Sequence, residues 1–284
     1  MKREKIALLV DSGCDLEASF IQKYSIYVAP FLVNYDGEEY TDGVDLDPLE
    51  VYRRFPQQIP KTSTPSIQTV EDTVRQIIAD GYESIVAIDV SDQLSSTIST
   101  VSMVLSEHSE IPSFVLNTKN ISIGSGFLAM WAAKKIKEGM RFADLKKYLP
   151  EKVKDSKVLF YMDTLDYLKA GGRIGGVTSV VGSLLKIRPI ISCDADGRYE
   201  TVALIRGDKN AKKKLLELAG TFSQGNPCWL ALLNGAAPEE AEAMKPMLKK
   251  EIRKGKIVAE HQITASLAVH TGPGLLGIGI LRNP

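Results

Sequence analysis

The first half of the chain alternates continuous apolar runs with amphipathic stretches, a pattern that is typical of an α/β fold. The apolar runs predict buried strands over Lys5 to Val10, Ile26 to Val33, Ser84 to Val90 and Ser113 to Asn117. The amphipathic stretches predict helices over Leu16 to Tyr24, Ile67 to Ala79, a segment ending near Ser106, and Gly124 to Lys137. We therefore expect an N-terminal three-layer α/β domain with a mostly parallel sheet.

An excursion that reads as a hairpin interrupts this alternation near residues 34–60, where Asp36-Gly37 and Asp42-Gly43 mark tight turns. After a charged helix over Phe142 to Lys154, the pattern changes to a hairpin around residues 194–197 and a mixture of helices and strands. The strands are expected at Ile187 to Cys193, Tyr199 to Arg206, Trp229 to Leu233, Ile257 to His261 and Leu275 to Leu281, and the helices at Lys209 to Ala219 and Pro238 to Lys254. We expect two domains, residues 1–157 and a smaller C-terminal α+β domain of residues 158–284.

Composition narrows the class of protein. Of the 284 residues, 44% are hydrophobic and 25% are charged, as in ordinary globular proteins. Thirty-five basic and thirty-five acidic residues leave no net charge, so no overall field favours nucleic acid or an anionic membrane. Three widely spaced cysteines indicate neither a disulfide framework nor a metal site. The apolar run near the N-terminus is too short for a signal peptide, and a cytoplasmic protein is expected.

Hydroxyl groups follow the predicted parallel strands, at the edge of the sheet where ligands bind in such folds. They belong to Ser12, which follows Asp11, to Thr62 and Ser63, to Ser91, and to Ser95, Ser96 and Thr97. Together with the free amides at helix starts, they would form an anion site. The alternative is that each hydroxyl only caps its own helix.

Among the three histidines, His108 and His261 lie in polar segments and are expected to be exposed, whereas His270 ends the apolar run Leu267 to Val269. The nearby Gly272 and Gly274 would let backbone approach a ligand closely. His270 could therefore bind a carboxylate, although a core histidine bonded to backbone is an equally good interpretation. The match of residues 272–277 to a dinucleotide-binding motif is rejected because too few residues follow it.

A glycine-rich segment within residues 161–191 holds one arginine. Thr164 can cap a short helix that ends at Ala170, and Arg173 lies between two pairs of glycines, residues 171–172 and 175–176. A guanidinium on such a loop is suited to an anionic group, while a solvated turn is the plainer interpretation. Val177 stands where a P-loop would need its lysine, which excludes that motif.

The same segment, with others, resembles the DegV family of bacterial fatty-acid-binding proteins, often called FakB subunits. The segments that carry the resemblance are residues 164–174 and 182–190, Val10 to Ser12, Tyr40 to Val44, Lys61 to Ser66, Leu94 to Thr97, Arg206-Gly207 and His270 to Gly274. Ser96 stands where the family usually has glycine, Thr64 where it often has glutamine, and Asn117 where it commonly has aspartate.

The resemblance implies a lipid-binding carrier that is not itself an enzyme and needs no cofactor or metal. It would hold a long-chain fatty acid of the palmitate, stearate or oleate class in a buried tunnel. Thr62, Ser95, Ser96 and His270 would bind the carboxylate, with Ser63, Ser91, Asp11 and Ser12 in possible support.

The resemblance also implies a partner. Arg173 and Arg206 match positions implicated in docking to the ATP-binding subunit of a fatty acid kinase. That subunit would phosphorylate the bound acid for phospholipid synthesis. Membrane contact would be at most transient, for lipid exchange, and no nucleic acid is implied.

Two other functions stay open at this stage. One is an enzyme similar to serine hydrolases that acts on a small anion through Ser95 and His270, although the sequence places no carboxylate to orient the histidine and shows no nucleophile elbow. The other is a regulatory domain that senses lipid with the same pocket.

Overall fold

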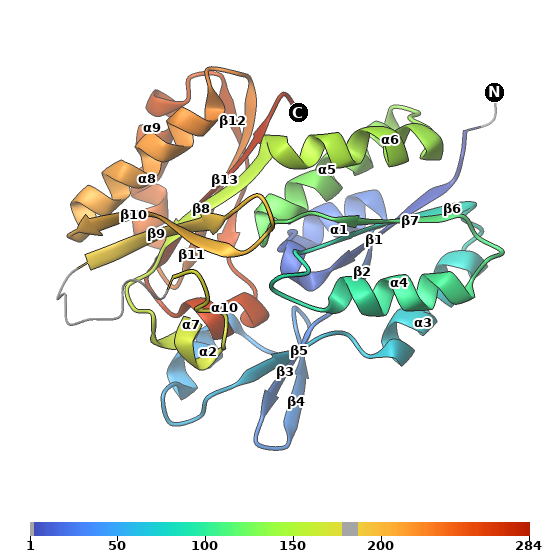
Figure 1. The fold of residues 1–284 in the computed structure, drawn as a ribbon, viewed down its shortest axis with the longest axis horizontal. Helices are drawn as coiled ribbons and strands as arrows, with labels where there is room; N and C mark the ends of the chain where they lie inside the picture. The colour runs from blue at the N-terminus through green and yellow to red at the C-terminus, as the bar shows by residue number, and fades with distance from the viewer. Residues whose placement is uncertain (1–2, 178–186) are drawn as a thin grey trace.

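The computed structural model describes residues 3–177 and 187–284 and contains two main sheets and one small sheet (Figure 1). The first main sheet has the order β2-β1-β6-β7, and all of its strands are parallel. Its strands are β1 (Ile6–Asp11), β2 (Tyr27–Ala29), β6 (Ser84–Asp89) and β7 (Ser113–Asn117). Every residue of β1 and β6 is buried, as the continuous apolar runs predict.

Helices cover both faces of this parallel sheet. On one face α3 (Ile67–Ala79) and α4 (Thr97–Glu107) pack on Leu9 and Ala87, and on the other α5 (Ile123–Lys137) packs on Leu8 and Val10. This half also contains α1 (Ala18–Tyr24), α6 (Phe142–Lys152) and the short 3₁₀ turns η1 (Ser12–Cys14) and η2 (Val153–Asp155). Ser66 caps α3, because its Oγ accepts a hydrogen bond from Thr69 N at 3.0 Å.

The second main sheet has six strands in the order β10-β9-β8-β13-β11-β12. They are β8 (Ser156–Tyr161), β9 (Ile187–Cys193), β10 (Tyr199–Arg206), β11 (Cys228–Gly235), β12 (Gly255–Gln262) and β13 (Leu275–Arg282). Only the β11–β12 pair is parallel among these strands. The fold class is as predicted, with a mostly parallel α/β part followed by an α+β part.

Helix α5 lies between the two main sheets, as Figure 1 shows. All eleven residues from Ile123 to Ala133 are buried, so the helix is apolar on every side. The other face of the six-stranded sheet is covered by α8 (Asp208–Ser223) and α9 (Pro238–Glu251). The two halves therefore share one hydrophobic core, and a domain division after residue 157 stays a prediction.

The small sheet corrects two sequence predictions. The strand predicted over Ile26 to Val33 is wrong as a single element, because the chain leaves β2 and passes through Pro30 before β3 (Leu32–Tyr35) begins. The excursion predicted near residues 34–60 extends beyond a hairpin, because β5 (Lys61–Ser63) pairs antiparallel with β3 and places Thr62 opposite Val33. The third strand is β4 (Glu38–Thr41).

Two short helices were not predicted. Helix α2 (Pro48–Arg54) begins with a cap from Asp47, whose Oδ1 accepts a hydrogen bond from Leu49 N at 2.9 Å. Helix α10 (Ala265–Thr271) contains the apolar run before His270 and packs against α2, β3, β5 and α7 (Asp166–Ala170). Six of its seven residues are buried, so its sequence lacks the period of a surface helix.

Within residues 3–177 and 187–284, no helix is both long enough and apolar enough to cross a membrane. Residues 182–186, which carry part of the family resemblance, lie outside the described residues.

Candidate functional site

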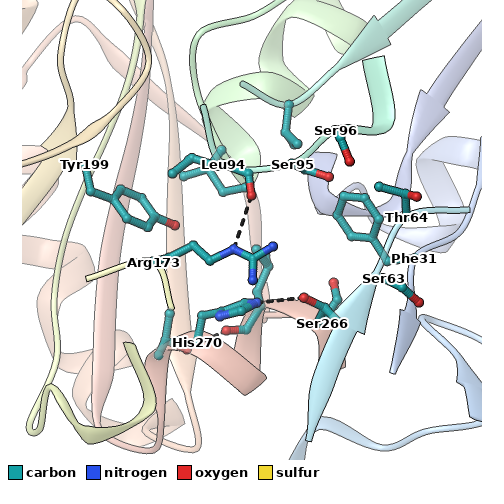
Figure 2. Close-up of a pocket in the computed structure, with 15 residues that line it drawn as sticks. Phe31, Ser63, Thr64, Leu94, Ser95, Ser96, Arg173, Tyr199, Ser266 and His270 are labelled. Carbon is teal, nitrogen blue, oxygen red and sulfur yellow. Dashed lines mark hydrogen bonds between the residues drawn. The ribbon is translucent and has the colours of Figure 1, made fainter. Parts of the chain in front are cut away.

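A cavity of about 260 Å³ lies where β5, the loop before α4, the glycine-rich segment and α10 meet (Figure 2). It brings together residues that are far apart in sequence. Its lining consists of Phe31, Thr62, Ser63, Thr64, Val90, Leu94, Ser95, Ser96, Ile121, Arg173, Tyr199, Ser266, Leu267, His270 and Thr271. All four residues that the family resemblance assigns to carboxylate binding are in this set.

His270 is held at the cavity by a hydrogen bond between its Nε2 and Thr62 Oγ1, at 2.9 Å. Burial, and then the neighbouring charge of Arg173, lower the pKa of His270 to about 3. The imidazole is therefore neutral at physiological pH. Its Nδ1 is enclosed and has no hydrogen-bond partner among the described residues.

Gly171 explains how the histidine ring can lie so close to the glycine-rich segment. A Cβ atom at position 171 would overlap the imidazole of His270, whereas the φ angle of Gly171 is −75° and does not itself require glycine. The glycine is therefore needed for the close approach of the ring.

Arg173 projects into the cavity and is anchored by two backbone carbonyl groups. Its Nε donates to Leu94 O at 3.3 Å, and its Nη1 donates to Gly171 O at 2.8 Å. Figure 2 shows the guanidinium between Leu94 and His270, facing the hydroxyl groups on the opposite wall. This anchored position differs from that of a solvated arginine on an open turn.

Hydroxyl groups dominate the polar part of the wall. Ser95 Oγ lies 2.9 Å from Thr97 Oγ1 at the start of α4, and Ser96, the N-cap residue, makes no side-chain cap. Ser266 Oγ donates to the buried carboxylate of Asp42 at 2.5 Å. Within residues 3–177 and 187–284, the lining contains seven serine or threonine residues, one arginine and no aspartate or glutamate. Such a wall suits an anion.

Four of the candidate residues lie outside this cavity. Asp11 and Ser91 are fully buried, and Ser12 Oγ accepts a hydrogen bond from Phe31 N at 2.9 Å, behind the cavity wall. Asp11 Oδ2 accepts from Val90 N at 2.9 Å, and burial raises the pKa of this carboxyl to about 7. Arg206 is exposed at the end of β10.

A second, apolar cavity of about 20 Å³ adjoins the first. The two share Ile121, Tyr199, Leu267 and Thr271 as walls. The other residues that line it are Ser122, Val158, Phe160, Leu233, Ile263, Leu275 and Gly277. The site is therefore polar at one end and apolar at the other, which matches an amphipathic ligand with an anionic head.

Sequence reasoning missed several wall residues and misplaced two histidines. Phe31, Tyr199 and Ser266 gave no local signal, because only the packing of separate segments brings them to the cavity. The prediction that His108 and His261 are exposed is wrong, since their side chains retain only 12% and 18% of their accessible surface. Both are partly buried against acidic residues, among them Glu71 for His108 and Asp15 for His261.

The geometry does not support a serine nucleophile. The Nε2 atom of His270 forms its hydrogen bond with Thr62 and not with Ser95, and the described lining offers no carboxylate to orient the ring. Among the described residues, no group of three or more metal-ligating side chains is found either.

Comparison with protein families gives one match over residues 5–283, to a family described as uncharacterised protein, DegV family. A DegV domain-containing protein of Clostridium acetobutylicum is 35% identical over 280 residues, which is 99% of this chain and 100% of that protein. One from Clostridium perfringens is 34% identical and matches over 99% of each chain.

Solved structures are similar over almost the whole chain. DegV, a fatty acid binding protein from Bacillus subtilis, has a TM-score of 0.88 and 26% identity, covering 99% of this chain and 100% of its own. A stearic acid-binding protein from Eubacterium ventriosum has a TM-score of 0.88 and 27% identity, covering 98% of each chain. A DegV family protein from Thermus thermophilus, described for its fatty acid binding, has a TM-score of 0.87 and 26% identity. The match covers 98% of this chain and 99% of that protein.

Proposed function

Because this chain belongs to the DegV family, we propose that it binds one long-chain fatty acid, with the carboxylate in the polar cavity and the tail in the apolar one. The observation that carries the proposal is the composition of the two adjoining cavities. In the part of the chain that the structure describes, seven serine or threonine residues and one arginine, without a carboxylate, line the first cavity, and almost only apolar groups line the second.

In this proposal the head group lies among Thr62, Ser95, Ser96 and His270. The hydroxyl groups donate to the carboxylate, and the neutral histidine adds a donor or holds Thr62 in place. Arg173 supplies the positive charge, since its guanidinium lies in the same cavity. Ser63 supports the wall at its outer side, where its Oγ accepts from Asn34 Nδ2 at 3.1 Å.

The two ends of the ligand would contribute differently to affinity. Burial of each methylene group contributes ~0.8 kcal/mol before the entropy of binding is subtracted. Each hydrogen bond to a charged carboxylate contributes only ~1.5–3 kcal/mol. A tail of about fifteen methylenes therefore dominates the gross free energy, and the polar cavity fixes the direction in which the acid binds.

The chemistry of the site favours presentation of the carboxylate over its conversion. We propose that this protein is a cytoplasmic carrier of the FakB type, which offers its bound acid to the ATP-binding subunit of a fatty acid kinase for acyl-phosphate formation and phospholipid synthesis. Arg206 is exposed and available for docking, whereas docking through Arg173 would require the kinase to reach the cavity.

Arg206→Ala should leave fatty acid binding unchanged and lower the rate at which the kinase phosphorylates the bound acid. An unchanged rate of phosphorylation would show that Arg206 has no role in docking.

A comparison of a fatty acid with its methyl ester tests the proposed head-group site. Delipidated protein is titrated with palmitate and with methyl palmitate while intrinsic fluorescence or melting temperature is recorded. The acid should bind at least roughly ten-fold more tightly, because the ester carries no charge for Arg173 and its alkoxy oxygen is only a weak hydrogen-bond acceptor. Equal affinity for both would contradict a carboxylate site in this cavity.

A further inference from the structure

The apolar cavity has a floor made by one row of residues across the six-stranded sheet. Gly277 on β13 pairs with Phe160 on β8 and with Leu233 on β11. All three residues line the cavity. The row therefore places a glycine between two bulky side chains on the same face of the sheet.

Two glycines of β13, Gly277 and Gly279, lie on this face of the sheet. They differ in the atoms that a Cβ added at each position would meet. A methyl group at Gly279 would overlap Ile123 and lie 3.1 Å from Phe127, so this glycine is explained by the close packing of α5 on the sheet. At Gly277 the nearest atoms to an added Cβ are Leu233 Cβ at 3.4 Å and Phe160 Cβ at 3.5 Å, which are ordinary contacts.

Neither packing nor conformation thus requires glycine at position 277. Its φ angle is outside the left-handed region, and a methyl group would fit. A glycine inside a strand weakens the sheet, and it often marks a place where a ligand approaches the backbone closely. Here the missing side chain leaves a notch that opens into the apolar cavity.

We infer that Gly277 sets the length of acyl chain that this protein accepts, with the end of the tail lying over the notch between Leu233 and Phe160. The inference rests on the proposed fatty acid binding. The apolar cavity, at about 20 Å³, has room for roughly one water molecule. Its walls must therefore part as a tail enters, and the residue at the floor decides how far the tail can reach.

The test is a titration of the delipidated full chain with laurate, myristate, palmitate and stearate, for the wild type and for Gly277→Ala, Gly277→Val and Gly277→Leu. Each methylene that loses its place should weaken binding about four-fold, while acids too short to reach the notch keep their affinity. The preferred chain should therefore shorten progressively from alanine to leucine. An alanine at position 277 makes only ordinary contacts with its neighbours, so Gly277→Ala should fold. If valine or leucine impairs folding, the shift in preferred chain length can still be measured in Gly277→Ala.

Ile278→Val is the matched control. Ile278 is the next residue of the same strand, and its side chain lies on the opposite face of the sheet, which α8 and α9 cover. This variant should lower the melting temperature slightly without changing the preferred chain length. An unchanged order of affinities in all folded Gly277 variants, or the same shift in Ile278→Val, would overturn the inference. Failure of the wild type to bind any of the four acids would overturn the proposed function, and with it this inference.

Discussion

At the scale of single residues, the positive charge of the polar cavity lies on the guanidinium group of Arg173. His270 is neutral, because burial and the nearby Arg173 lower its pKa to about 3. None of the described residues that line the cavity has an acidic side chain. Arg173 is therefore the one cation among the described residues that line the cavity. A ligand with a single negative charge matches this arrangement, and a neutral lipid would leave the guanidinium without a counter-charge.

Ser95→Ala tests the hydroxyl wall at this scale. The variant removes one donor to the carboxylate, so fatty acid affinity should fall roughly ten- to hundred-fold, as expected for the loss of a hydrogen bond to a charged group. Isothermal titration of the delipidated protein with palmitate measures the change. Ser91→Ala is the control, since Ser91 lies in the same loop but is buried outside the cavity. Equal affinity of Ser95→Ala and wild type would exclude Ser95 as a ligand of the carboxylate.

At the scale of elements, the site depends on how α7, α10 and β5 meet. Helix α10 carries His270 and packs against both α7 and β5, so the histidine contacts Thr62 on one side and Gly171 on the other. The carbonyl of Gly171 also accepts a hydrogen bond from Arg173. The end of α7 therefore positions both the cation and the imidazole.

Gly171→Ala should disturb both groups, because the new methyl group overlaps the ring of His270. Loss of the Thr62–His270 contact should weaken palmitate binding by roughly ten-fold or more. Gly175→Ala is the matched control in the same segment, since a methyl group there meets no atom of the described residues within 4 Å. Similar affinities for the two variants in the titration would show that Gly171 has no positioning role.

The elements also show how far the sequence can predict this fold. Continuous apolar runs located β1, β6 and β7 to within a residue or two. The signal is clear for β1 and β6 because every residue of these strands is buried, whereas β7 is only partly buried. Helix α10 was missed because burial on nearly all sides removes its amphipathic period. The break at Pro30 and the pairing of Lys61–Ser63 depend on contacts between distant segments, which local patterns do not contain.

For the cavity too, local sequence patterns predict some residues but not those that only contacts between distant segments bring together. The hydroxyl group of Ser95 could be predicted from its place after a parallel strand, and His270 from its neighbouring glycines. Thr62 was expected on the same ground as Ser95, but it lies within β5 of the small antiparallel sheet. Tyr199 and Phe31 could not, because they reach the cavity only through the packing of β10 and of the turn after β2. Whether each of these residues contacts a ligand stays a prediction.

At the scale of the whole molecule, the two cavities lie at the joint between the two main sheets. Their walls include Val90 and Ile121 from the first half of the chain and Tyr199 and Leu267 from the second. A ligand that fills them would add apolar contacts to both halves at once. Binding should therefore stabilise the fold as one unit, with a melting temperature that rises with the concentration of free fatty acid.

Native mass spectrometry of the purified full chain, followed by denaturation and lipid extraction, tests the central claim most directly. The account predicts one adduct per chain with the mass of a long-chain fatty acid, which is released on denaturation and recovered in the extract. Delipidated protein should regain the same adduct on incubation with palmitate or oleate. A mass without adduct, unchanged after incubation with free fatty acids, would contradict the account.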